Sequence, residues 1–289
     1  MLNSHPAGTF GGTWVTEALP LDEAKARSAH EAALASARFP VSDPQIEVHA
    51  SIGSTNDRAK ELAAAGAPEG SMVVSLAQES GRGRRGRAWS SPSGGLYFSL
   101  LLRPDDAMLR RLPVTLLGGL AAVQTLEEHD VPATLKWPND VHVNGRKVAG
   151  ILGEMDRDEV GHRLVLGVGI NVATDLSALP PEVAELATSV AAVRGGEAPP
   201  PEVLLESFLA HFFGHYGAIR RGGGATILAM ASARMPLLGQ PITVRLSPEK
   251  RVSGIASGLS ATGGLVLEHE DGQRREVLLA GEVEEVRAK

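Results

Sequence analysis

The sequence predicts an α+β protein, in which a mixed, mainly antiparallel sheet carries helices on one face and a small all-β domain follows. Two short apolar stretches, 72–77 and 96–102, have the length and composition of buried strands and flank a polar loop. Asn144-Gly145 lies between alternating segments and is typical of a type I′ hairpin turn. After Pro236, short apolar segments recur at a spacing of roughly ten residues, which predicts a small closed β-barrel.

The first 44 residues are predicted to form a peripheral extension. Their start is rich in turn residues, and an Ala-rich stretch over 21–38 favours one helix that ends before Pro40. A DNA-binding winged helix needs three helices and a wing, so one helix is too little for that module. The extension is therefore expected to carry no DNA-binding duty.

The next segment reads as a strand followed by a capped helix. Residues 45–51 alternate weakly, and Ser54 or Thr55 can cap the helix that follows, with Asp57 in its first turn. Gly66 is placed to end this helix. Helix capping is by itself a sufficient reason for a serine and a threonine at these positions.

The middle of the chain completes the expected sheet and its helices. A helix is predicted within 104–130, and strands are predicted on both sides of the hairpin turn and over 164–172. A second amphipathic helix covers 202–219. We place a domain boundary near Met235, which divides the chain into an extension (1–44), a catalytic domain (45–235) and a β domain (236–289).

Composition excludes several classes of protein and site. The 289 residues carry a net charge of −6, which argues against a general nucleic-acid binder, and the absence of cysteine excludes disulfides and thiolate chemistry. The sequence contains neither an 18-residue apolar run nor a signal peptide at its start. A cytoplasmic protein without a membrane partner is expected.

Residues 78–89, Gln-Glu-Ser-Gly-Arg-Gly-Arg-Arg-Gly-Arg-Ala-Trp, form the most distinctive stretch. Glycines let the backbone approach a ligand, and arginines suit carboxylates and phosphates. A dinucleotide fingerprint would have to run into a helix, but Pro92 and Gly94-Gly95 follow instead. The Lys-Ser/Thr of a Walker motif and the downstream kinase signatures are missing. A loop that closes over a small anion remains, with a nonspecific nucleic-acid patch as the open alternative.

A second polar group follows at Lys136-Trp137-Pro138-Asn139-Asp140, with Lys147 seven residues beyond the aspartate. A carboxamide, a carboxylate and two ammonium groups can together hold a base, a divalent metal and a phosphate. In isolation, ordinary turn chemistry with solvated lysines is the favoured explanation of the segment. Its coexistence with the arginine loop favours a shared site.

Four motifs together resemble the biotin protein ligase (biotin–[acetyl-CoA-carboxylase] ligase) family. They are the arginine loop with Trp89, the 136–140 segment, Lys147-Val148-Ala149-Gly150-Ile151-Leu152, and Gly167-Val168-Gly169-Ile170-Asn171. The resemblance runs from about residue 48 to the C-terminus and is that of the monofunctional class. It implies a class II synthetase-like catalytic fold with an SH3-like C-terminal barrel. The implied activity joins biotin to ATP as biotinyl-5′-AMP, with Mg²⁺, and transfers biotin to a lysine of a carboxylase carrier protein.

The resemblance also implies roles for individual residues. The catalytic residues would be Lys147, Arg82 and Asp140, with Asp140 holding Mg²⁺ or orienting the phosphates. Biotin would be bound by Ser54, Thr55, Asn56, Gln78, Gly81, Arg82, Lys147 and Gly150. ATP and the adenylate would be bound by Arg84, Arg85, Trp89, Lys136, Asn139, Asp140 and Asn171. Asn139 would read adenine, Arg84 and Arg85 would close the loop, and Asn171 would support the pocket floor or simply cap a strand.

Alternatives remain open at this stage. A lipoate ligase or octanoyltransferase has a similar catalytic domain but lacks the full arginine loop together with the 136–140 motif. A nucleic-acid module would use the arginine loop with the β domain. Members of the family often have an arginine soon after the final Gly-Glu that reaches the nucleotide, and Arg287 lies about one residue from that position. A homodimer, the identity of the carrier protein and the role of the first 44 residues are not decided by the sequence.

Overall fold

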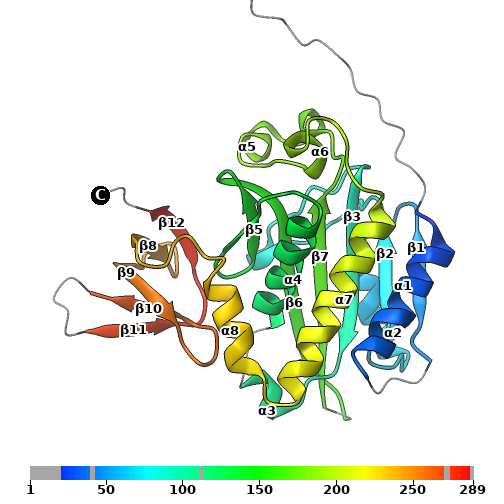
Figure 1. The fold of residues 1–289 in the computed structure, drawn as a ribbon, viewed down its shortest axis with the longest axis horizontal. Coiled ribbons are helices and arrows are strands. Elements are labelled where there is room, and N and C mark those ends of the chain that lie inside the picture. Colours follow the sequence, from blue (N-terminus) through cyan, green and yellow to red (C-terminus); the bar gives the residue numbers. More distant parts are fainter. Residues whose placement is uncertain (1–20, 40–42, 111–113, 160, 270–273, 287–289) are drawn as a thin grey trace, which may run out of the picture.

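A computed structural model describes residues 21–39, 43–110, 114–159, 161–269 and 274–286 (Figure 1). Its larger sheet has seven strands in the order β1-β2-β3-β7-β6-β5-β4. The strands are β1 (Ile46–His49), β2 (Met72–Ser75), β3 (Gly95–Leu102), β4 (Thr134–Lys136), β5 (Asp140–Val143), β6 (Arg146–Arg157) and β7 (His162–Asn171). Only β1 and β2 pair in parallel, and the other neighbours pair antiparallel, so the predicted mixed, mainly antiparallel sheet is confirmed.

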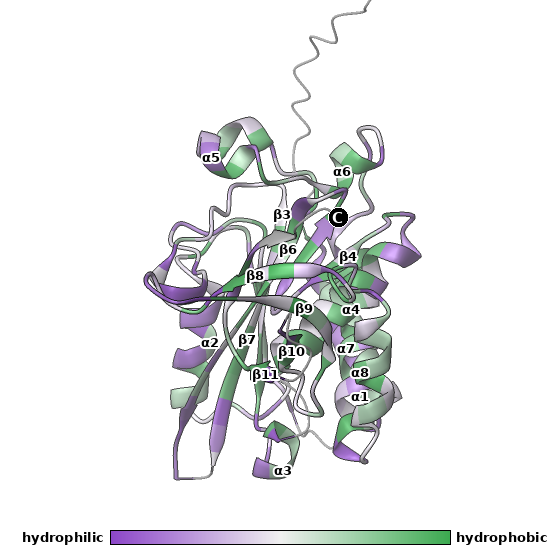
Figure 2. Ribbon diagram, turned by 90° about the vertical axis from the view of Figure 1, so that its left-hand side faces the viewer, coloured by the Kyte–Doolittle hydropathy of each residue, from purple (hydrophilic) through white to green (hydrophobic). Residues whose placement is uncertain are grey.

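Helices cover both faces of this sheet. The helices are α1 (Glu23–Ser36), α2 (Thr55–Ala64), α3 (Asp106–Leu109), α4 (Val114–Glu128), α5 (Pro181–Ala184), α6 (Val190–Val193), α7 (Pro201–Arg220) and α8 (Gly224–Ser232). Figure 2 shows α2 on one side of β7, and α4, α7 and α1 on the other. The expectation of helices on one face is therefore wrong for α2. Hydrophobic periodicity shows that a helix has an apolar side, but it does not show which face of the sheet that side covers.

Successive side chains of the central strands point to opposite faces of the sheet, so apolar residues cover both faces. Val73, Leu101 and Val165 pack with the apolar side of α2 in a small separate cluster. Their sequence neighbours Met72, Leu100 and Leu166 point the other way, into the main core beneath α4 and α7. Since β3 is buried at every position, its run of apolar residues is that of a strand covered on both faces.

Several local signals in the sequence act as expected. Ser54 is the N-cap of α2, where its side chain accepts a hydrogen bond from the Asp57 amide at 3.4 Å. Asn144 and Gly145 have φ of 50° and 77°, the positive values that a type I′ turn requires. Gly66, just after α2, has φ of 90°. The helix expected within 104–130 comprises α3 and α4, and residues 111–113 between them lie outside the described part.

The C-terminal strands form an open sheet in the described residues, and the predicted closed barrel is wrong. The order is β11-β10-β9-β8-β12, with every neighbouring pair antiparallel. The strands are β8 (Pro241–Arg245), β9 (Arg251–Leu259), β10 (Leu265–Glu268), β11 (Arg275–Leu278) and β12 (Glu282–Val286). Strand spacing predicts a meander of strands, but closure depends on a pairing between β11 and β12 that no local pattern specifies.

The described helices include none that is both long enough and apolar enough to cross a membrane. The turn-rich start of the N-terminal extension lies outside the described residues. The part of it that the structure describes is α1, whose buried alanines pack among the aromatic residues of α7. The expected domain boundary near Met235 and the absence of a DNA-binding module stay predictions.

Candidate functional site

Glycines on the α2 side of β6 and β7 form the floor of the site. Gly150 and Gly169 face each other across these strands. A Cβ on Gly150 would lie 2.9 Å from the Trp89 ring, and a Cβ on Gly169 would lie 2.8 Å from its indole nitrogen. Any larger residue at either position would displace Trp89. Gly150 and Gly169 are therefore explained by close packing against the loop.

The arginine loop is a short hairpin with a fixed base. Gln78 bridges to Ser91, and its backbone amide donates to the Ser91 carbonyl at 2.9 Å. Further out, Arg82 bridges to Ala88 around the 3₁₀ turn η1 (Arg84–Gly86), in which Arg85 has φ of 58°. A Cβ on Gly81 would lie 2.4 Å from the Trp89 carbonyl oxygen, so glycine is required there as well. The loop is thus anchored at both ends while its tip carries exposed arginines.

The loop and the 136–147 region come together at Trp89. The Lys147 Nζ lies 4.9 Å from the centroid of the Trp89 ring and 2.7 Å from Asp140 Oδ1. Arg84 Nη1 donates to Asn139 Oδ1 at 2.9 Å. Two segments more than fifty residues apart in the chain therefore share one site, as the paired motifs predicted.

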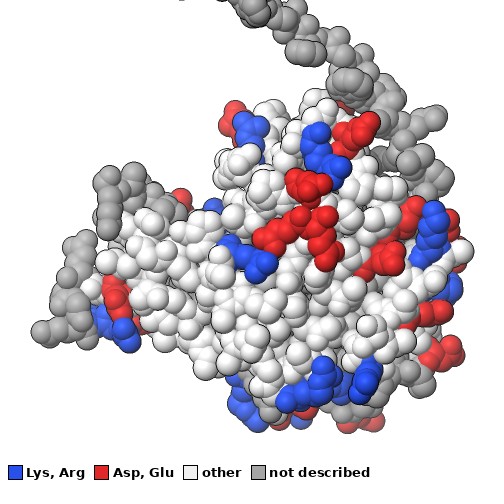
Figure 3. Space-filling model, in the orientation of Figure 1, with Lys and Arg blue, Asp and Glu red and all other residues white. Residues whose placement is uncertain are grey.

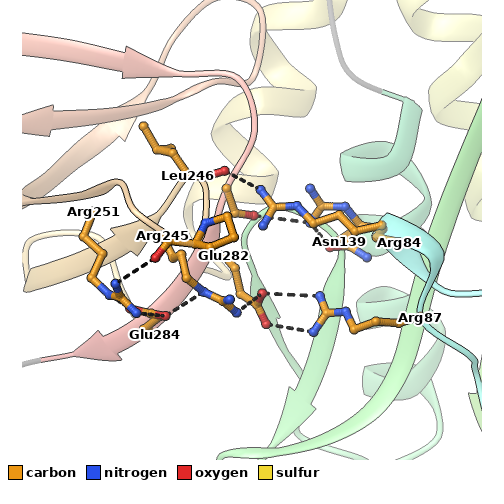
Figure 4. Close-up of polar contacts among 11 residues, drawn as sticks. Arg84, Arg87, Asn139, Arg245, Leu246, Arg251, Glu282 and Glu284 are labelled. Atoms are coloured by element: carbon orange, nitrogen blue, oxygen red, sulfur yellow. Dashed lines mark hydrogen bonds and ion pairs between the residues drawn. The ribbon is translucent and has the colours of Figure 1, made fainter.

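The loop arginines also reach the C-terminal sheet (Figure 4). Arg84 and Arg85 donate to the carbonyl oxygens of Gly281 and Leu246, at 3.4 and 2.8 Å. Arg87 forms a two-pronged ion pair with Glu282, at 3.0 and 3.3 Å. These contacts fasten the loop tip to β12 and to the end of β8. The C-terminal sheet is thereby part of the site's wall.

Acidic residues of β12 balance this positive charge. Glu282 also accepts from Arg245 at 2.8 Å, and Arg245 and Arg251 both pair with Glu284 (Figure 4). Burial acts to raise the pKa of Glu282, but the hydrogen bonds from Arg87 and the charge of Arg245 outweigh it and lower that pKa. Glu282 therefore stays ionised at neutral pH as the partner of two arginines.

Arg82 differs from its neighbours, because it turns toward α2. Its guanidinium pairs with Asp57 at 2.8 Å, and its side chain is about half exposed. The structure therefore offers the Arg82 backbone, and not its charge, to the interior of the loop. A direct catalytic role for the Arg82 side chain is not supported by this geometry.

The predicted biotin-binding residues cluster at the N-terminus of α2. Thr55 and Asn56 are buried, and Gln78 Oε1 accepts from the Thr55 amide at 2.9 Å. Gln78 Nε2 donates to Ser91 Oγ at 2.9 Å, which fixes the orientation of the Gln78 amide. These groups form a polar corner beside the glycine floor, with hydrogen-bonding atoms in defined directions.

Three of the predicted nucleotide-binding residues have structural contacts here. Asn139 donates to the Ile151 carbonyl at 2.8 Å and its Oδ1 accepts from Arg84, with a second lone pair able to accept from a base. Asn171 donates to the Thr188 carbonyl at 3.0 Å, which favours the supporting role over that of a strand cap. Lys136 lies opposite Asp140 in the register of β4 and β5.

Sequence reasoning missed the segment that covers Lys147. The Lys147 amide donates to the Leu186 carbonyl at 2.7 Å, and the Thr188 amide donates to the Lys147 carbonyl at 2.8 Å. This pairing puts the exposed Leu186, after α5, next to the lysine. The segment carries no charged motif, so nothing in its composition indicated a place at the site. Ser99 and Glu154, which contact Asn56, were also missed, because each lies in a strand without a motif around it.

The described residues contain no cluster of three or more side chains able to hold a metal ion. Asp140 is the one predicted metal ligand, and its Oδ1 is paired with Lys147. Mg²⁺ typically binds through one or two carboxylates together with substrate phosphates. Asp140 therefore fits the role of one carboxylate ligand to a magnesium ion that would arrive with a nucleotide.

The charge distribution argues against the alternative that the arginine loop binds nucleic acid. On the face seen in Figure 3, Lys and Arg side chains of the described residues alternate with Asp and Glu, without a broad positive area. The loop arginines are paired with acidic residues or carbonyl oxygens. A continuous track of unpaired cations, which a nucleic-acid backbone needs, is not what this arrangement offers.

Comparison with known proteins agrees with this geometry. Residues 48–171 match the model of the biotin/lipoate A/B protein ligase family, and residues 237–284 match the biotin protein ligase C-terminal domain. The chain is 36% identical over 238 residues to the biotin–[acetyl-CoA-carboxylase] ligase of Paracoccus denitrificans, covering 80% of this chain and 96% of that one. It is 42% identical over 150 residues to the bifunctional ligase/repressor BirA of Bacillus subtilis, and spans about half the length of that relative (46%).

Solved structures show the same fold. The Aquifex aeolicus biotin protein ligase in complex with biotin and ATP superposes with a TM-score of 0.71 at 32% identity, covering 83% of this chain and 97% of that one. The Leishmania major biotin protein ligase in complex with biotinyl-5-AMP gives a TM-score of 0.53 at 25% identity, over 83% and 100% of the two chains. With the motifs converging in space and the similarity to the Paracoccus protein extending over nearly its whole length, this chain belongs to the biotin protein ligase family.

Proposed function

We propose that this protein activates biotin with ATP and transfers it to a lysine of a biotin carboxyl carrier protein. In the first step a biotin carboxylate oxygen attacks the α-phosphorus of ATP, the bond to the β-phosphate bridging oxygen breaks, and pyrophosphate leaves. In the second step a lysine amine attacks the acyl carbon of biotinyl-5′-AMP, AMP leaves, and an amide forms with loss of one proton. The observation that carries this proposal is the meeting of the arginine loop, Lys147 and Asp140 over the glycine floor.

Lys147 has the central role in the first step. The biotin carboxylate is ionised at neutral pH, so it needs no general base, and its attack on a phosphate brings negative groups together. An ammonium held by Asp140 and Trp89 is positioned to neutralise that charge. Asp140 orients the lysine and would be the residue that holds Mg²⁺ with the phosphates; the ion, when bound, withdraws charge from them.

The loop is the part of the site that we infer to close over the intermediate. Ser54, Thr55, Asn56 and Gln78 would bind the ureido head, while Gly81, Gly150 and the Arg82 backbone would let biotin lie close to the sheet. Trp89 would wall the acyl phosphate, and Arg84, Arg85, Lys136 and Asn139 would surround the nucleotide. Excluding water protects the mixed anhydride until a carrier lysine arrives.

The relatives support the choice of substrates. The Paracoccus protein is named for acetyl-CoA carboxylase, and the Aquifex complex contains biotin and ATP. We accordingly propose a cytoplasmic enzyme whose protein partner is the carrier domain of acetyl-CoA carboxylase or a related carboxylase. A side-by-side homodimer and the lack of specific DNA binding belong to the same proposal.

Incubation with ATP, Mg²⁺, biotin and an isolated carrier domain tests the proposal. We expect biotin-dependent exchange of pyrophosphate into ATP, and a gain in carrier mass equal to one biotinyl group on one lysine. Lipoate in place of biotin is the matched comparison, since the family model covers both classes of ligase. Exchange that depends on lipoate and ignores biotin would refute the assignment.

A further inference from the structure

Arg82 is held by the first turn of α2, apart from the other arginines of the loop. Its Nε and Nη2 atoms both donate to Asp57 Oδ2, at 2.9 and 2.8 Å. Arg84, Arg85 and Arg87 instead contact the C-terminal sheet. The arginine loop is therefore fastened to α2 at its inner arm and to the C-terminal sheet at its tip.

The main chain around Arg82 is flexible by composition, because the residue lies between Gly81 and Gly83. Two hydrogen bonds across the loop flank it, from the Trp89 amide to the Gly81 carbonyl at 2.9 Å and from the Gly83 amide to the Arg87 carbonyl at 2.7 Å. This pattern makes Arg82 part of a non-hydrogen-bonded pair, so its own amide and carbonyl point away from the other arm of the loop. The Arg82 side chain therefore ties this piece of main chain to a helix.

Asp57 is an acceptor that α2 holds in place. Its amide donates to the Ser54 side chain at 3.4 Å, and the helix dipole favours its negative charge in the first turn. Lys60 Nζ lies 3.8 Å from Asp57 Oδ1 and 2.7 Å from Glu154 Oε1. Asp57 thus lies between two cations, and its removal would leave Arg82 and Lys60 as neighbouring like charges.

We propose that Asp57 is a positioning residue, which fixes the main chain at Arg82 and thereby slows the escape of the bound intermediate. This inference rests on the proposed function, in which the Arg82 backbone meets biotin and the loop covers biotinyl-5′-AMP. The Arg82 and Asp57 side chains are 51% and 37% exposed, so the pair is a modest restraint. It should therefore change how long the loop stays closed, while the protein still folds and the loop still opens.

Hydrogen exchange of the ligand-free protein tests the restraint itself. Amides of residues 79–89 should exchange about two- to fivefold faster in Asp57→Asn than in the wild-type protein, because the loop opens more often. Glu61→Gln is the matched control. It removes another carboxylate of α2, which pairs with Arg58 at 2.8 Å, and it should leave exchange in the loop unchanged. Asp57→Glu keeps the charge and should largely restore the protection.

The functional consequence is measured as the release of labelled biotinyl-5′-AMP from the full chain, in the absence of a carrier protein. The rate constant of release should be about two- to fivefold higher in Asp57→Asn than in the wild-type protein at low salt. At about 1 M salt the two rate constants should converge, because the ion pair is screened. Combining Asp57→Asn with Arg82→Gln should release the intermediate no faster than Asp57→Asn alone, because both changes remove the same contact.

The possible failures are separable. Unchanged release from Asp57→Asn, or an equal increase in Glu61→Gln, would overturn the inference. Additive effects of Asp57→Asn and Arg82→Gln would overturn it as well, because the two residues would then act separately. If the wild-type protein supports no biotin-dependent pyrophosphate exchange, the proposed function fails, and hydrogen exchange in the loop still decides whether Asp57 restrains Arg82.

Discussion

Removal of the Lys147 ammonium is the sharpest test of how the site works. The Nζ atom is fixed by Asp140 at 2.7 Å and by the Trp89 ring at 4.9 Å, so its charge is held in place before substrates bind. A unit charge about 4 Å from a phosphate oxygen, at an effective dielectric constant of about 20, contributes about 4 kcal/mol. That energy corresponds to about a thousandfold in rate if all of it is realised in the transition state. Lys147→Met should therefore reduce adenylate formation between about a hundred- and a thousandfold.

The assay is biotin-dependent pyrophosphate–ATP exchange, measured beside the dissociation constant for biotin alone. Biotin binding should remain measurable, because the polar corner at the start of α2 is built without Lys147. The free energy of unfolding should change little. The side chains of Lys147 and Asp140 are 29% and 25% exposed, and such partly exposed pairs contribute about 0–1 kcal/mol. Lys25→Met, which removes an exposed lysine on α1, is the matched control and should leave the exchange unchanged. Exchange within threefold of wild type in Lys147→Met would show that the lysine has been given the wrong role.

Three further perturbations have defined outcomes. Arg84→Gly removes the contacts to Asn139 and to the C-terminal sheet, so biotinyl-5′-AMP should escape and label bystander proteins; full retention of the intermediate would contradict the closing role of the loop. Gly169→Ala displaces the Trp89 indole, so it should lower the free energy of unfolding by about 1–3 kcal/mol and raise the KM for biotin. Gly214→Ala is the control and should do neither, because nothing lies within 4 Å of the added Cβ. Burial lowers the pKa of His30 to about 4, below its ordinary 6.5, so its contribution to stability is fully present above pH 6.5 and falls by about 3 kcal/mol as the pH drops toward 4. Denaturant unfolding between pH 7 and 4 should show that loss, and His30→Phe should flatten it; equal slopes in both proteins would refute the assignment.

Features determined by neighbouring residues could be predicted from the sequence. The Ser54 cap, the Asn144-Gly145 turn and the strands on either side of the loop each depend on a few adjacent side chains. The motifs also indicated two segments that meet in the structure, the arginine loop and the 136–147 region. What they did not give was which atoms of those residues contact one another.

Long-range contacts account for the rest. Arg87 pairs with Glu282 across 195 residues of sequence, and either residue alone reads as an ordinary exposed charge. Ser99 reads as one more residue of an apolar strand, and only the register that sets it opposite Gly167 shows that it lies beside Asn56. The side of the sheet taken by α2 and the open edge of the C-terminal sheet likewise depend on packing between distant elements. Such features follow from topology, which local patterns do not encode.

The present partners of the loop arginines are hydrogen-bond acceptors that a bound nucleotide could replace. Arg84 donates to the Asn139 oxygen that would also read a base, and Arg87 pairs with Glu282 on the C-terminal sheet. On the proposed function, a nucleotide would offer phosphate oxygens to the same guanidinium groups, and each arginine would exchange one acceptor for another. Strand β12 therefore holds the loop tip through Glu282, and we expect an anionic substrate to offer competing acceptors to the same arginines.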